Sequence, residues 1–279
     1  MTPWQIRSSR TLELARPFGI MGILNLTPDS FYDGSQYNSL PRALAQCGAL
    51  LRDGSDIIDV GAESTRPGAT AIAAQTECDR LLAALQTIRK EYAQAVISVD
   101  TTHALTAAQA LQAGCDIIND VSACSRDDDL LDVVADFKPG YVLTHSQAAA
   151  DRLGLGAPQG DITGAVLNFF ERQLARLTSA GLPEANIVLD PGIGFGKTAR
   201  EDIELMRHAD QFLQFGRPLL YGISMKSFFA QMCGLSPNDR GQATATTCAL
   251  LFTKGVTWHR VHHPAEAATA LTCARELQE

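Results

Sequence analysis

Short apolar runs along the chain repeatedly end in a carboxylate or an amide. Asp59, Asp100, Asn119 and Asp190 each stand at the end of such a run. A buried carboxylate needs N–H donors or a metal ion to balance its charge. The edge of an aminopyrimidine offers such donors, because its exocyclic NH2 and ring N–H can pair with one carboxylate. These residues therefore predict a pocket for a flat nitrogen heterocycle.

A second set of side chains is cationic. Lys226, Arg260 and His262 follow the last two apolar runs, and Arg66 follows an early one. Guanidinium and ammonium groups suit phosphate or carboxylate. Ser224 and Lys226 also stand where a helix is expected to begin, so backbone N–H groups would add to an anion site. The ligand is therefore expected to be both heterocyclic and anionic.

The segment from Pro191 to Lys197 contains a Gly-Phe-Gly-Lys sequence that superficially resembles a P-loop. The first glycine of that motif would fall at Pro191, so the pattern fails. We interpret the segment as a tight loop that brings backbone close to a flat ligand, with Phe195 as a wall of the site.

The histidines show neither an H-E-x-x-H motif nor a pair on the first strand, so no permanent zinc site is expected. His103 and His208 fall within predicted helices and are interpreted as surface or packing residues. His259 is expected to point outward from the sheet, because Arg260 and His262 share the opposite face of their strand.

Eight β-branched runs are each followed by a segment with a 3.6-residue apolar period. The predicted strands are Gly19–Asn25, Asp56–Val60, Val96–Asp100, Asp116–Asp120, Tyr141–His145, Ile187–Asp190, Leu219–Ile223 and Trp258–His262. The predicted helices are Leu40–Arg52, Gln75–Glu91, Thr102–Ala113, Asp129–Phe137, Asp161–Ala180, Arg200–Gln214, Gly241–Lys254 and Pro264–Leu277.

Eight such units in 279 residues favour an α/β fold made of one (β/α)8 barrel, a TIM barrel, over an open doubly wound sheet, which is the alternative. Chemistry in such barrels takes place at the C-terminal ends of the strands, where the polar residues fall. The alternative for any one of these residues is that it caps a helix or closes the mouth of the barrel.

The bulk properties exclude several classes of protein. A net charge of -8 argues against a partner such as nucleic acid, which requires a basic face. No apolar run has the length of a membrane span or the character of a signal peptide. The seven cysteines are scattered and never form C-x-x-C, which indicates reduced thiols. We expect a single cytoplasmic domain over residues 1–279.

Seven blocks of sequence resemble those of dihydropteroate synthases, in the same order. The blocks are Gly22–Phe31 (GILNLTPDSF), Asp59–Gly68 (DVGAESTRPG), Ser98–Thr101, Ile117–Asp120, Leu189–Lys197, Ser224 with Lys226–Phe228, and Arg260–His262. They span almost the whole chain, and the resemblance implies the same barrel fold.

The resemblance assigns a role to each matched position. The pterin is expected to contact Asp100, Asn119, Asp190 and Lys226, with Asp190 pairing in bidentate fashion. The pyrophosphate is expected to contact Asn25, Arg260 and His262, with Asn25 also holding Mg2+. The p-aminobenzoate is expected to contact Thr65, Arg66, Pro67, Phe195 and Ser224. The candidate catalytic residues are Lys226, Arg260 and Asp29, of which Asp29 would stabilise a carbocation or orient the amine.

The resemblance also implies a reaction and an assembly. In the family, an arylamine nitrogen displaces pyrophosphate from the exocyclic CH2 of a pterin, and cationic character develops on that carbon. Such a reaction needs no nucleophilic side chain, since the leaving group is neutralised by Mg2+ and cations. A homodimer is expected.

Three positions depart from the family pattern. The Ser-Arg-Lys-Ser usual in the family reads Ser-Met-Lys-Ser here, with Met225 in place of the arginine. His263 replaces an aspartate, and His145 begins a segment that usually contains glycine. These changes are expected to lie at the rim of the site. They leave open a second hypothesis, a pterin-binding paralogue that is non-catalytic or uses another arylamine.

Overall fold

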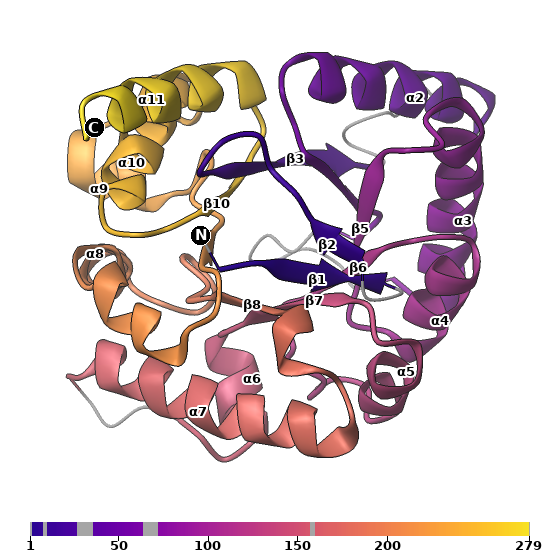
Figure 1. Ribbon diagram of the computed structural model, residues 1–279, viewed down its shortest axis with the longest axis horizontal. Helices are drawn as coiled ribbons and strands as arrows, with labels where there is room; N and C mark the ends of the chain where they lie inside the picture. Colours follow the sequence, from indigo (N-terminus) through magenta and orange to yellow (C-terminus); the bar gives the residue numbers. More distant parts are fainter. Residues whose placement is uncertain (1, 8–9, 27–35, 64–71, 157–159, 279) are drawn as a thin grey trace.

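The computed structural model describes residues 2–7, 10–26, 36–63, 72–156 and 160–278, and within these residues eight parallel strands form a barrel (Figure 1). The helices form a ring around the strands. The strand order is β8-β7-β6-β5-β4-β3-β10-β9. A parallel bridge between Leu189 and Leu219 closes the circle. The predicted (β/α)8 barrel is confirmed, and the open sheet was the wrong alternative.

All eight predicted strands are present. Their bounds are β3 (Gly19–Asn25), β4 (Ile57–Gly61), β5 (Val96–Asp100), β6 (Ile117–Asp120), β7 (Gly140–Thr144), β8 (Ile187–Asp190), β9 (Leu220–Tyr221) and β10 (Trp258–Val261). Three match the prediction, and the others differ by one or two residues at one or both ends. The β-branched runs therefore identified the strands because each run is buried between the barrel interior and the helices.

The helices follow the predicted pattern with some differences. They are α2 (Gln36–Arg52), α3 (Ala74–Glu91), α4 (Ala104–Gln112), α5 (Asp129–Phe137), α6 (Gln147–Arg152), α7 (Ile162–Ala180), α8 (Ala199–Arg207), α9 (Phe228–Cys233), α10 (Gly241–Phe252) and α11 (Pro264–Glu276). Short α6 and α9 were missed because six residues are too few to show a helical period. No helix among the described residues is long and apolar enough to cross a membrane.

One predicted helix, Arg200–Gln214, is in fact two elements. The α-helix α8 ends at Arg207, and a 3-10 helix, η3 (Ala209–Phe215), follows. The change in winding places Phe212 and Phe215 edge-on against Phe170, with ring centroids 5.8 and 6.0 Å apart. Aromatic packing thus overrides the helical period of the sequence.

The side chains that point into the barrel are apolar near the N-terminal ends of the strands and polar near the C-terminal ends. The inner cluster near the N-terminal ends of the strands contains Ile57, Ile117, Val188 and Trp258, all buried. Because strand side chains alternate, the residue two positions later shares the same face. The inward face therefore continues toward the mouth with Asp59, Asn119, Asp190 and Arg260, each within two residues of the C-terminal end of its strand.

A hairpin closes the floor of the barrel. Strands β1 (Trp4–Ile6) and β2 (Arg10–Leu12) pair antiparallel and cross the end of the barrel (Figure 1). Trp4 packs edge-on against Trp258 at 5.2 Å and donates from Nε1 to the Asn186 carbonyl at 2.8 Å. Gly19 makes room for Trp258, because a Cβ there would lie 2.3 Å from the indole ring. No pattern in the sequence predicted this hairpin.

Candidate active site

Arg260 links two carboxylates at the mouth of the barrel. Its Nε donates to Asp59 Oδ2 at 2.6 Å, and its Nη2 donates to Asp100 Oδ2 at 2.8 Å. Asn119 Nδ2 donates to the same Asp59 oxygen at 3.1 Å. Strands β4, β5, β6 and β10 thus converge on one network. A guanidinium carries five N–H groups, so Arg260 keeps donors for an anionic ligand after making both ion pairs.

The electrostatics of this network follow from its burial. Burial raises the pKa of Asp100 to about 7, against the lowering effect of Arg260 and with the help of the Asp59 charge. Burial lowers the pKa of Arg260, but Asp59 and Asp100 outweigh it and hold that pKa above its usual value. Arg260 therefore stays charged, while Asp100 is able to change protonation near neutral pH.

Asp190 and Lys226 form the opposite side of the site. Asp190 is only 5% exposed, and its Oδ1 accepts from the Gly192 N–H at 2.8 Å. Burial raises the Asp190 pKa, while Lys226 lowers it. Lys226 Nζ donates to the Ile193 carbonyl and lies 4.3 Å from the centre of the Phe195 ring. Phe195 therefore stands beside the buried ammonium as well as lining a cavity.

The Lys226 side chain changes its charge close to physiological pH. Burial lowers its pKa to about 8, although Asp190 raises it. The ammonium is therefore charged at neutral pH and becomes neutral in mildly alkaline solution. Such a group can donate strongly to a carbonyl oxygen or to a ring nitrogen of a heterocycle.

Asn25 is the last residue of β3 and lies level with Asp100 across the sheet. The strand register pairs Asn25 with Gly61 and Gly61 with Asp100. Gly61 leaves space between them, since a Cβ there would lie 3.4 Å from Asp100 Cβ and 3.9 Å from Asn25 Oδ1. An amide oxygen beside a carboxylate in an open cradle suits Mg2+, which prefers oxygen ligands and commonly shares substrate phosphates.

Ser224 and His262 are hydrogen-bonded to each other. The His262 backbone N–H donates to Ser224 Oγ at 3.1 Å, and His262 Nδ1 lies 2.9 Å from the same oxygen. When the Ser224 hydroxyl donates to Nδ1, the other ring nitrogen of His262 carries the proton. Ser224, which is expected to contact the arylamine, is therefore adjacent to His262, which is expected to contact the pyrophosphate.

Met225 sits in a constrained backbone position between Ser224 and Lys226. Its φ is +61°, the left-handed region that non-glycine residues rarely adopt. Its N–H donates to Thr244 Oγ1 at 3.2 Å, and its carbonyl accepts from Arg240 Nη1 at 3.0 Å. Helix α10 and the residue before it thus hold the backbone at the position where the family has an arginine.

The loop after β8 is a tight glycine turn, as interpreted from the sequence. Gly192, Gly194 and Gly196 all have positive φ. A Cβ on Gly192 would lie 1.8 Å from the His145 carbonyl oxygen, so this position requires glycine. Lys197 Nζ links the segment after β7 to the loop after β8, because it donates to the His145 carbonyl at 3.1 Å and to the Gly192 carbonyl at 2.8 Å. Burial lowers the pKa of Lys197 to about 7, and the sequence analysis gave this residue no role.

The departure at His145 does not lie at the rim, which corrects the expectation from the sequence. The side chain is 1% exposed and packs edge-on against Phe169 at 4.8 Å. Burial lowers its pKa to about 2, so it stays neutral. His145 therefore contributes through packing beneath the loop that follows β8. His263, in contrast, is exposed before α11.

Four expected site residues fall outside the described residues. They are Asp29, Thr65, Arg66 and Pro67. Their expected roles remain predictions.

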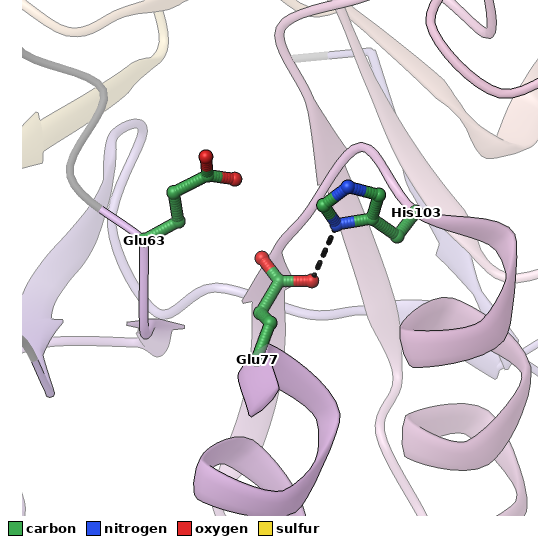
Figure 2. Close-up of side chains that lie close together, drawn as sticks. All are labelled: Glu63, Glu77 and His103. Carbon is green, nitrogen blue, oxygen red and sulfur yellow. Dashed lines mark hydrogen bonds and ion pairs between the residues drawn. The ribbon is translucent and has the colours of Figure 1, made fainter. Parts of the chain in front are cut away.

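A cavity of about 400 Å³ adjoins Asp100 and Phe195. On its far side Glu77 Oε2 accepts from Thr101 Oγ1 at 2.7 Å and lies 3.0 Å from His103 Nδ1 (Figure 2). The prediction that His103 lies within a helix was wrong, because α4 begins at Ala104 and His103 is on the preceding loop. Glu63, Glu77 and His103 come from three separate segments of the chain and form no short sequence motif, so the sequence did not predict this cluster.

The chain matches known proteins across most of its length. The family model described as "Pterin binding enzyme" matches residues 21–262. A dihydropteroate synthase of Synechocystis sp. is 39% identical over 87% of this chain and 84% of its own length. A solved Xanthomonas albilineans dihydropteroate synthase with 4-aminobenzoic acid has a TM-score of 0.88 and 32% identity, over 99% of this chain and 98% of the other. A complex from the same organism with 7,8-dihydropteroate has a TM-score of 0.86 and 30% identity, over 98% of each chain.

Proposed function

The chain belongs to the dihydropteroate synthases, a family of pterin-binding enzymes, and on that premise we propose how its barrel mouth performs their reaction. The substrates are 6-hydroxymethyl-7,8-dihydropterin pyrophosphate and p-aminobenzoate. The bond from the exocyclic carbon to the phosphate oxygen breaks, and its electron pair leaves with pyrophosphate. The arylamine nitrogen bonds to that carbon and loses a proton, which gives 7,8-dihydropteroate. The enzyme is a transferase of folate biosynthesis.

Burial of the Asp190 carboxylate opposite Lys226 is the observation that carries the pterin half of the proposal. Asp190 Oδ1 already accepts the Gly192 N–H, yet both oxygens retain lone pairs for the amino group and ring N–H of a pterin. Lys226 would donate to an acceptor on the opposite side of the ring. Asn119 and Asp100 would complete the edge, with Asp100 held in place by Arg260.

The leaving group faces the cationic side of the mouth. We assign Arg260 and His262 to the pyrophosphate, because Arg260 keeps unused N–H donors and His262 stands on the same strand end. Asn25 would hold Mg2+ in the cradle beside Asp100. Bound there, Mg2+ would neutralise charge on the departing pyrophosphate. The protein groups orient this oxygen-rich end before the bond breaks, which lowers the cost of reorganisation.

The arylamine half rests on Phe195 and Ser224 among the described residues. Ser224 sits beside the pyrophosphate residue His262, and Phe195 lines the cavity next to Lys226. We assign Thr65, Arg66 and Pro67 to the same substrate and Asp29 to the developing cation. These assignments rest on the match of their sequence blocks to the family. A single domain over 1–279, a homodimer and a cytoplasmic location are further proposals.

The substitution Asp190→Asn tests the pterin site. The amide keeps the shape and can still accept from Gly192, but it turns an NH2 toward the pterin donors and removes the charge. We expect pterin pyrophosphate to bind roughly 10- to 100-fold more weakly, as for loss of a hydrogen bond to a charged group. Isothermal titration calorimetry measures this.

Asp202→Asn is the matched control. Asp202 is also buried and accepts the Gly194 N–H at 2.7 Å, but it lies on α8. Pterin affinity should change by less than about threefold in this variant. Equal affinity in wild type and Asp190→Asn would remove Asp190 from the pterin site.

A further inference from the structure

Glu63, Glu77 and His103 bring three metal-ligating side chains to one point beside the pterin pocket (Figure 2). One ligand atom from each lies within 4.8 Å of the others. Glu63 follows β4, Glu77 is in the first turn of α3, and His103 precedes α4. The cluster differs from the Asn25 position in its chemistry, because it offers an imidazole nitrogen together with carboxylates.

Glu77 carries a buried carboxylate oxygen that has no partner among the described residues. Its side chain is fully buried, and Oε2 is occupied by Thr101 and His103. No described residue donates to its other oxygen, Oε1, which is also buried. Figure 2 shows this oxygen turned away from His103 and toward Glu63. A buried carboxylate oxygen without a partner is costly, and a cation is the usual remedy.

The distances fit ligation after small side-chain movements. His103 Nδ1 and Glu77 Oε2 are 3.0 Å apart. Two neighbouring ligands about 2.1 Å from one ion lie on the order of 3 Å apart. Around a tetrahedral ion every pair of ligand atoms lies roughly 3.4 Å apart, so a spacing of up to 4.8 Å has to contract by as much as about 1.4 Å, which rotation of the Glu63 side chain can provide.

Arg126 competes for the same place. Its Nη1 lies 3.3 Å from Glu63 Oε2 and donates to Thr102 Oγ1 at 3.1 Å. The guanidinium therefore neutralises Glu63 in the absence of an ion. An ion bound between Glu63 and Glu77 would take over that role and displace Arg126 toward the adjoining cavity, which Arg126 also lines.

We propose that Glu63, Glu77 and His103 form a binding site for a divalent transition-metal ion, separate from the Mg2+ position at Asn25. One imidazole with two carboxylates suits Zn2+ or Mn2+, whereas Mg2+ favours oxygen ligands alone. Three protein ligands leave a coordination position open to the cavity of about 400 Å³. The ion would connect the segment after β4, helix α3 and the loop after β5, and β5 ends at Asp100, which is assigned to the pterin.

The test is a titration of the full chain with Zn2+ in the presence of excess Mg2+. Isothermal titration calorimetry measures the stoichiometry and the affinity. The exposed thiols Cys233 and Cys273 are first changed to serine, because they would bind Zn2+ on their own. We expect one Zn2+ per chain, unaffected by Mg2+. His103→Ala should weaken this binding roughly tenfold or more. The matched control His208→Ala, which removes an exposed histidine, should leave the affinity unchanged.

Two further variants sharpen the result. Arg126→Gln should tighten Zn2+ binding, because the competing guanidinium is gone. Glu77→Gln should weaken it, with circular dichroism to check that the buried substitution still folds. Absence of stoichiometric Zn2+ binding, or equal affinity in wild type and His103→Ala, would overturn the site. Because the readout is metal binding, neither outcome depends on whether the chain turns over its substrates.

Discussion

Arg260 illustrates how single residues at the mouth serve two purposes. It neutralises Asp59 and Asp100, which are buried, and it presents its remaining N–H groups to an anion. Removal of the side chain would leave two buried carboxylates without their partner, a change that typically costs about 3–5 kcal/mol. Its contribution to binding is therefore tested better by Arg260→Lys, which keeps the charge, than by truncation.

The pH dependence of turnover follows from Lys226. Burial lowers the pKa of this ammonium to about 8, so the charged form is present below pH 8 and is lost as the pH rises through that value. We predict that kcat/KM for the pterin substrate is high at pH 7 and falls between pH 8 and 9, since a neutral amine is a weaker donor. A profile that stays flat over pH 7–9 would show that the charge of Lys226 is not used.

Met225 stands where the family has an arginine, so we expect its replacement to change the affinity for p-aminobenzoate. Met225→Arg restores a fixed cation without new backbone strain, because one non-glycine residue replaces another at a φ of +61°. We expect KM for p-aminobenzoate to fall by roughly fivefold or more, through a charge-assisted contact with its carboxylate. Met225→Leu controls for shape and should leave KM unchanged. If both variants match the wild type, a cation at the rim is dispensable.

The sequence predicted the residues at strand ends because their position depends only on alternation and strand register. Asp190 and Arg260 were found in this way. The contact between Arg260 and Asp59 joins residues 201 positions apart, and only the closed barrel brings them together. The cluster of Glu77 and His103 was missed because the first turn of α3 and the loop before α4 meet only in the packed structure. His145 was misplaced because its burial depends on Phe169 of α7.

At the scale of elements, the floor of the barrel depends on the β1–β2 hairpin. Trp4 fills the space under the strands and packs against Trp258. This hairpin was not predicted, because strands of three residues are too short to show a period in the sequence. The long helices and strands were predicted well because each buries one regular face, whereas the break between α8 and η3 reflects packing of Phe212 and Phe215 on Phe170.

Trp4→Ala should lower the free energy of unfolding by about 3–5 kcal/mol, since it opens a cavity in a fully buried cluster. Urea unfolding measures this. The kcat of the folded variant should stay near that of the wild type, because Trp4 lies at the end of the barrel opposite the site. Gln5→Ala, on the same strand but partly exposed, is the control. Unchanged stability in Trp4→Ala would show that the hairpin does not close the core.

At the scale of the whole molecule, eight parallel strands closed by the Leu189–Leu219 bridge place Asp59, Asp100, Asn119, Asp190 and Arg260 at one mouth. The count of strand–helix units predicted this architecture from the sequence. The substrate loops expected at Asp29 and at Thr65 to Pro67 lie outside the described residues, so their proposed roles rest on the sequence match alone. The residues proposed for the pterin and the pyrophosphate, in contrast, come from strand ends or from the turn after β9 that carries Lys226, all of which are described.

Turnover of the unmodified chain tests the central claim most directly. The purified protein is mixed with Mg2+, 6-hydroxymethyl-7,8-dihydropterin pyrophosphate and p-aminobenzoate, and both products are measured, with dihydropteroate identified by mass. We predict one pyrophosphate released for each dihydropteroate formed, and none released when p-aminobenzoate is omitted. Tight binding of the pterin substrate without product would contradict the account and identify the chain as a pterin-binding paralogue.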